Sequence, residues 1–230
     1  MWKPTRTVPS NSRRREELPV RHHTLKIGVA AAVLVAVTAA CSPPSSVGGT
    51  PAPQTTAVNA DGKLPSGAPH VAKPLDVSRA QASPCNSLTP AQISSFGIVA
   101  TGKPGDPTLG PKCDWSDTST VPSLMTVSVV FVTKSTGGLS SLYVQAESLK
   151  KVGGYFEPID PIQGYPALLY SQLDDRKAKT NAACNLGIGV SDTLQVAVGV
   201  VVGTPSPQSD PCTIDKKAAD MVMTNLKAGS

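Results

Sequence analysis

The chain has 230 residues, enough for one domain with appendages or two small domains, and a formal net charge of +5. The excess charge is N-terminal: seven basic and two acidic residues precede Cys41, and the 14 basic and 14 acidic residues that follow balance. The rest of the chain has no surplus of cations to follow a phosphate backbone, so we expect no nucleic-acid partner.

Residues 27–40 (IGVAAAVLVAVTAA) form an uncharged apolar run with basic residues in front. A membrane-spanning helix needs about 20 apolar residues, whereas the core of a signal peptide needs roughly 7–15. Residues 1–40 are therefore predicted to be an export signal. An uncleaved membrane anchor and a buried helix are the alternatives, and the long stretch before Lys26 also suggests that translation begins near residue 20.

Cys41 makes the cysteine count odd, at five, which in an exported protein calls for an explanation. The triplet Ala39-Ala40-Cys41 resembles the lipobox of bacterial lipoproteins, in which the cysteine is lipidated and becomes the mature N-terminus. The resemblance implies a lipid-anchored protein on the extracytoplasmic face of the cell membrane. A free exported cysteine and a thiol within a spanning segment are the alternatives. The other four cysteines are an even number, suited to two disulfides in an oxidising compartment.

The next segment, residues 41–75, is dominated by Pro, Gly, Ser, Thr and Ala. Such a tract cannot bury enough apolar surface to offset the entropy lost on ordering, so we predict a disordered tether. A single folded domain is expected over residues 76–230.

Periodicity gives the expected elements of this domain. Thr89-Pro90-Ala91-Gln92 has the pattern of a capping box with proline at the first helical position, which predicts a short helix ending at Gly97. The apolar spacing predicts further elements in chain order: strands at 112–116 and 124–132, a helix at 138–151, strands at 155–159 and 165–172, a hairpin of 183–190 and 193–202, and a helix at 213–227. Because strands dominate and follow one another through short turns, we expect an α+β domain with an antiparallel sheet and helices packed on one face.

The four remaining cysteines allow three pairings. Cys85 and Cys113 are 28 residues apart, as are Cys184 and Cys212. A two-residue turn at 191–192 brings the return strand level with Cys184 near Gly199, from where a short loop leads to Cys212. We therefore favour the pairs 85–113 and 184–212.

Several short motifs occur in a characteristic order over the expected domain. They are Pro84-Cys85 with Leu88-Thr89, Phe96-Gly97, Cys113-Asp114-Trp115, Gly164-Tyr165-Pro166-Ala167, Cys184, and Asp210-Pro211-Cys212 followed by Ala218-Ala219. Together with the signal and tether, this order resembles a family of secreted actinobacterial lipoproteins known as domain of unknown function 3558. The resemblance implies an extracytoplasmic lipoprotein with two disulfides and no established activity.

The expected domain contains no histidine, because His70 falls within the predicted tether. This argues against a Ser-His-Asp or Cys-His mechanism and against a His-ligated metal site, and no cofactor motif occurs. Two carboxylate pairs remain as candidates for acid–base chemistry, Asp114 with Asp117 and Glu157 with Asp160. For each pair a solvated turn or strand end is the simpler interpretation.

Other residues have weaker functional interpretations. Trp115 is expected to pack on a disulfide rather than a ligand, and the charged stretch 174–179 is expected to be an exposed loop. Tyr155, Tyr165 and Tyr170 are candidates for a binding surface, and the loop 102–111 is long enough to border a cleft.

These observations favour a non-enzymatic binding or sensor module of the cell envelope, anchored to the membrane through lipidated Cys41. Its ligand is expected to be an envelope protein or a small molecule. The alternatives are a cell-wall-modifying enzyme that uses paired carboxylates and a structural protein of the envelope.

Overall fold

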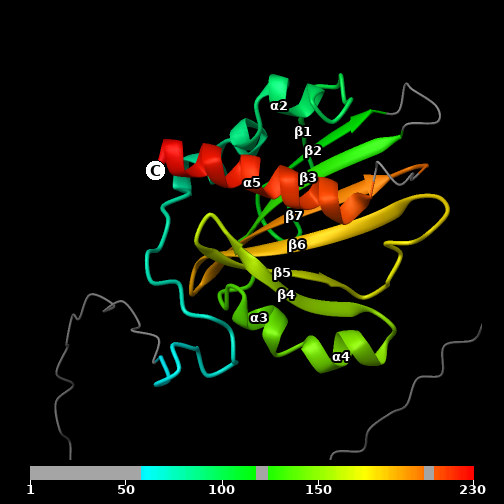
Figure 1. Cartoon of the computed structure of the whole chain (residues 1–230). Helices are drawn as coiled ribbons and strands as arrows, with labels where there is room; N and C mark the ends of the chain where they lie inside the picture. The colour runs from blue at the N-terminus through cyan, green and yellow to red at the C-terminus, as the bar shows by residue number, and fades with distance from the viewer. Residues whose placement is uncertain (1–57, 118–123, 205–209) are drawn as a thin grey trace, which may run out of the picture. The chain divides into compact units, whose positions relative to one another are not determined.

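Alternating apolar residues build an antiparallel sheet (Figure 1). The computed structural model describes residues 58–117, 124–204 and 210–230. Within them the strands are β1 (Lys103–Pro104), β2 (Lys112–Asp117), β3 (Met125–Val132), β4 (Tyr155–Ile162), β5 (Tyr165–Ser171), β6 (Ala182–Ser191) and β7 (Leu194–Val202). The strand order is β1-β2-β3-β7-β6-β5-β4, with every pair antiparallel. The predicted signal peptide, Cys41 and residues 41–57 lie outside the described residues.

The β6–β7 hairpin has the predicted strands but a register one residue from the one expected. Ser191 pairs with Leu194, so the turn residues are Asp192 and Thr193, and the pairing shifts between Gly189 and Ser191. Cys184 consequently lies opposite Val200 rather than Gly199.

Helices cover the sheet. They are α1 (Ser78–Ala82), η1 (Pro84–Ser87, a 3-10 helix), α2 (Pro90–Ser94), α3 (Ser140–Tyr143), α4 (Ala146–Lys151) and α5 (Pro211–Gly229). The predicted capping box of α2 is present: the Gln92 amide N–H donates to the Thr89 hydroxyl, and the Thr89 amide N–H donates to the Gln92 side chain.

The main core lies between α5 and one face of the sheet, and η1 and α2 lie on the same side. Val127, Val129 and Phe131 of β3 meet alternating residues of β6 and β7 there, as the period of two predicts. Ala218 and Val222 of α5 complete this core.

The amphipathic segment 138–151 forms two short helices instead of the single helix expected. Gln145 interrupts it: its side-chain amide donates to the Ser141 carbonyl, and its backbone N–H bonds to Leu142 three residues back. The Ser141 carbonyl would accept the Gln145 backbone N–H in a continuous helix, so this side-chain bond competes with the helix.

The α3 helix covers the opposite face of the sheet. Leu139 and Leu142 belong to a second buried cluster with Leu64, Ala68 and Leu168. They lie over Gly187 and Gly189, where an added Cβ would come within 3.1–3.2 Å of the leucine side chains. The two glycines therefore allow α3 to pack closely on β6. The antiparallel α+β architecture is confirmed, but α3 departs from the expectation that the helices share one face.

Residues 58–75, part of the predicted tether, are packed against the domain. Leu64, Ala68 and Val71 are buried, and the Leu75 amide N–H donates to the Val190 carbonyl. The boundary expected at residue 76 is therefore wrong. The composition of the segment predicted disorder, but its few apolar residues are enough to order it because they pack on a face of the sheet.

Both disulfides join the pairs that the sequence favoured. Cys85 of η1 bonds Cys113 of β2, and Cys184 of β6 bonds Cys212 in the first turn of α5. The sulfur bridges therefore fasten η1 and the start of α5 to the sheet.

Candidate functional site

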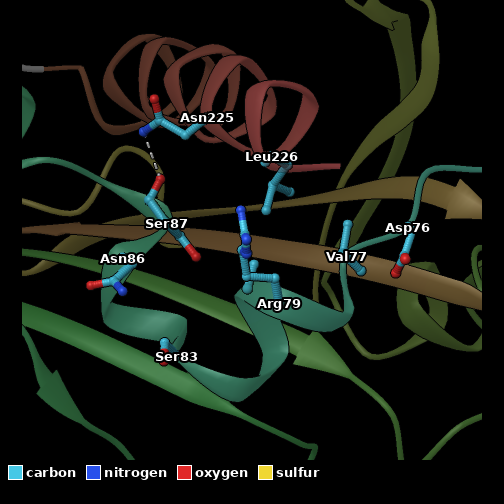
Figure 2. A pocket seen from close by; sticks show the side chains of 10 residues that line it. Asp76, Val77, Arg79, Ser83, Asn86, Ser87, Asn225 and Leu226 are labelled. Atoms are coloured by element: carbon cyan, nitrogen blue, oxygen red, sulfur yellow. Dashed lines mark hydrogen bonds between the residues drawn. The ribbon is translucent and has the colours of Figure 1, made fainter.

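A pocket of about 380 Å³ lies between α1, η1 and the last turns of α5 (Figure 2). We call it the α1–α5 pocket. Its polar residues include Asp76, Arg79, Ser83, Asn86 and Ser87, and Val77, Ala80 and Leu226 supply apolar surface. This volume is at the lower end of the roughly 300–1,000 Å³ typical of small-molecule sites.

Asn225 fixes one wall of the pocket by tying α5 to η1 and α2. Its side-chain amide donates to the Ser87 carbonyl at 2.9 Å, a bond drawn in Figure 2, and to the Gln92 side chain at 2.8 Å. The Cys85–Cys113 disulfide holds the same short helix on β2. The wall is therefore set by contacts between segments more than 130 residues apart in sequence.

Two opposite charges border the pocket without pairing with each other. Asp76 accepts a hydrogen bond from the Ser78 amide N–H at 2.9 Å, and this bond lowers the pKa of Asp76 below that of an ordinary aspartate. Asp76 is therefore ionised at neutral pH. Arg79 makes no ion pair or cation–π contact within the part of the chain that the structure describes.

Ser87 adds a buried hydroxyl to the same pocket. The residue is 1% exposed, and its Oγ has no hydrogen-bond partner among the described residues. Burying a hydroxyl without a partner costs about 1–3 kcal/mol. A buried hydroxyl without a partner calls for an explanation, and a ligand bound in the pocket that Ser87 and Arg79 both line is one.

The structure does not bring the first predicted carboxylate pair together. Asp114 and Asp117 lie on opposite faces of β2, because their sequence separation is odd and side chains alternate along a strand. Asp114 is bonded by the Ser128 hydroxyl and lies 3.0 Å from the Lys112 ammonium. These two carboxylates therefore cannot act together as acid and base on one bond of a substrate.

Glu157, of the second pair, is held by Arg176 in the charged stretch 174–179. The Arg176 guanidinium lies 2.9 Å from Glu157 and 2.6 Å from Asp174, and it stacks 3.8 Å from the centre of the Tyr155 ring. This stretch is thus fastened to β4. Asp160 lies elsewhere, in a shallow hollow with Lys216.

The three tyrosines do not share a surface. Tyr155 is buried in the main core, whereas Tyr170 packs against the second cluster on the other face, and burial raises its pKa to about 12. Tyr165 borders a separate hollow together with His70.

Trp115 is buried in the main core on β2, next to the disulfide-bonded Cys113. Gly102 of the loop 102–111 approaches both side chains closely: an added Cβ would lie 2.5 Å from the indole nitrogen and 2.7 Å from the Cys113 sulfur. Gly102 and Trp115 also border a second pocket of about 380 Å³, along α2. The loop therefore does border a hollow.

His70 belongs to the ordered domain, so the expectation that the domain contains no histidine is wrong. Its Nδ1 lies 2.7 Å from Asp192 Oδ2 in the β6–β7 turn, and the other oxygen of Asp192 accepts the Val71 amide N–H at 2.8 Å. Asp192 thereby fastens residues 58–75 to the sheet. His70 also borders the hollow that contains Tyr165.

Asp215 on α5 is a group that the sequence reasoning missed. It is 0% exposed, neither carboxylate oxygen has a hydrogen-bond partner in the described chain, and burial raises its pKa well above that of an ordinary aspartate. Helical spacing places it on one stripe with Ala219 and Val222, and this spacing could have revealed its burial. It borders none of the pockets described above.

Across the described ranges, no group of three or more His, Cys, Asp or Glu side chains is arranged to hold a metal ion. None of the helices in these ranges is long and apolar enough to span a membrane.

The chain matches a protein-family model. The model described as "Protein of unknown function (DUF3558)" matches residues 36–225. The chain belongs to the DUF3558 family. No curated protein matches the chain.

Proposed function

We propose that this DUF3558 protein is a lipid-anchored, extracytoplasmic binding module of the cell envelope, without enzymatic activity, whose ligand site is the α1–α5 pocket. The observation that carries the site is the buried Ser87 hydroxyl, which has no partner in the described chain and lies in one pocket with the uncommitted Arg79. A bound ligand would supply the missing partners. Two disulfides suit an oxidising compartment outside the cytoplasm.

The anchor rests on sequence: Ala39-Ala40-Cys41 follows a signal-like apolar run. Expression of the unaltered chain and of Cys41→Ala, followed by membrane fractionation, tests it. The unaltered protein should remain with membranes and carry acyl chains on Cys41 by mass spectrometry. Cys41→Ala should be released once the signal is cleaved. A Cys41→Ala protein that still partitions with membranes after cleavage refutes the anchor.

The binding site is tested by filling the pocket. Ala80 borders it, so Ala80→Trp should block it. Ala91→Trp places the same side chain on an exposed position of α2 and is the matched control. A fragment library screened by ligand-observed NMR should give hits that persist in the control and disappear in Ala80→Trp. Hits that are unaffected by Ala80→Trp would move the site elsewhere.

No observation favours the alternative of a cell-wall-modifying enzyme with paired carboxylates. Asp114 and Asp117 lie on opposite faces of β2, and Glu157 is engaged by Arg176.

A further inference from the structure

One side of the α1–α5 pocket is suited to an anion. Arg79 offers a permanently charged guanidinium with no ionic partner among the described side chains. Ser87 adds its buried, unpartnered hydroxyl, and the short side chains of Ser83 and Asn86 lie along the same wall. Guanidinium groups bind carboxylates through paired, charge-assisted hydrogen bonds. This side therefore matches a carboxylate.

Another part of the pocket is suited to a cation. Asp76 is ionised, and its hydrogen bond with the Ser78 amide leaves further carboxylate lone pairs open. Leu226 and Gly229 come from the last turn of α5, where unpaired carbonyl groups carry partial negative charge. An ammonium group would be favourable here.

Asp76 and Arg79 do not pair with each other, so both charges are available to a single ligand. Asp76 lies two residues before the start of α1, and Arg79 is the second residue of that helix. Here no ion pair joins them, although both border one pocket. Both side chains are exposed to solvent, so an anion alone pairs with Arg79 only and a cation alone pairs with Asp76 only, whereas a ligand that carries both charges pairs with both side chains.

We propose that the α1–α5 pocket binds a small zwitterion, a molecule of amino-acid or dipeptide size whose carboxylate meets Arg79 and whose ammonium group meets Asp76. The ligand's apolar portion lies against Val77, Ala80 and Leu226. This inference rests on the proposed function, because it uses the same pocket.

Three probes of one shape test the inference on the full-length protein by isothermal titration calorimetry. L-Leucine carries both charges, 4-methylpentanoate lacks the ammonium group, and 3-methylbutylamine lacks the carboxylate. Leucine should bind at least tenfold more tightly than either analogue, because each analogue leaves one charged side chain without its partner.

Two conservative variants assign the charges. Arg79→Gln should weaken leucine binding at least tenfold and remove the preference for leucine over 3-methylbutylamine. Asp76→Asn keeps an acceptor for the Ser78 amide and should remove the preference for leucine over 4-methylpentanoate. Lys103→Gln on β1 and Asp160→Asn on β4 change the same charges outside the pocket and should leave binding unchanged. Circular dichroism spectra of the variants check that each one folds.

An analogue that binds as tightly as leucine overturns the inference in favour of a singly charged ligand. If neither leucine nor leucyl-leucine binds at concentrations up to about 10 mM, the proposed ligand class is wrong. In that case fragment hits that Ala80→Trp abolishes would leave the pocket itself in place as the proposed site. The unaltered chain decides these outcomes, so they do not depend on whether a variant folds.

Discussion

The Cys184–Cys212 disulfide fastens β6 to the first turn of α5, the helix whose last turn borders the α1–α5 pocket. Its cysteines are 28 residues apart. Cross-linking a loop of that length removes about 3.6 kcal/mol of conformational entropy from the unfolded chain at 25 °C. We expect Cys184→Ala/Cys212→Ala to lower the free energy of unfolding by this amount. Alanine is the suitable replacement, because Cys184 is buried and serine would bury a hydroxyl.

Urea unfolding followed by circular dichroism measures the loss. With a slope of about 2 kcal/mol per molar urea, the midpoint should fall by about 1.8 M. Cys85→Ala/Cys113→Ala opens a loop of the same 28-residue separation and should lose a similar amount. Cys41→Ala removes the fifth cysteine and neither disulfide, so it serves as the control.

Two results would refute the reasoning. A loss below about 1 kcal/mol would mean that loop entropy contributes little. A difference of more than about 2 kcal/mol between the two double variants would mean that local packing, rather than loop length, sets the stabilisation. The slope must stay unchanged for either comparison to hold, since a changed slope reports altered compactness of the unfolded chain.

Three further predictions concern the fold. Because burial raises the pKa of Asp215, this carboxyl should contribute stability that is lost as the pH rises above about 3.8, by at most about 1.4 kcal/mol per pH unit. Asp215→Asn should remove this contribution, so the variant should lose less stability than the unaltered chain between pH 4 and pH 7 in urea titrations. An unchanged pH dependence would contradict the prediction. Gly189→Val should lower the free energy of unfolding by about 1–3 kcal/mol, because the new side chain displaces Leu139. Gly229→Ala, where an added Cβ would have nothing within 4 Å, should leave the melting temperature unchanged. Equal melting temperatures for the two variants would contradict the packing of α3. Asp192→Ala should raise the rates of hydrogen exchange and proteolysis in residues 58–75 more than His70→Ala does, because His70→Ala leaves the Val71–Asp192 hydrogen bond intact. Equal protection in both variants would argue that Asp192 does not hold this segment on the sheet.

Local chemistry specified much of this fold in advance. The strands of the β6–β7 hairpin and the stripe of α5 follow from the period of their apolar residues, and the α2 helix follows from Thr89 and Gln92. The hairpin also predicted the disulfide partners, despite an error of one residue in its register. These features depend on residues close in sequence, or on one short turn, and a pattern of types can carry such information.

Only the tertiary structure decided the rest. Residues 58–75 are ordered because they pack on a face of the sheet and bond to Asp192, more than 100 residues away in sequence. The predicted helix over 138–151 is interrupted because the Gln145 side chain donates a hydrogen bond to the Ser141 carbonyl. The spacing of apolar residues does not predict such a bond. The α1–α5 pocket forms where residues 76–87 meet the last turns of α5. The Ser87 hydroxyl is buried without a partner among the described residues only because these two segments pack together. Sequence patterns predict which residues are buried. Contacts between segments that are distant in sequence determine which buried polar groups lack a hydrogen-bond partner.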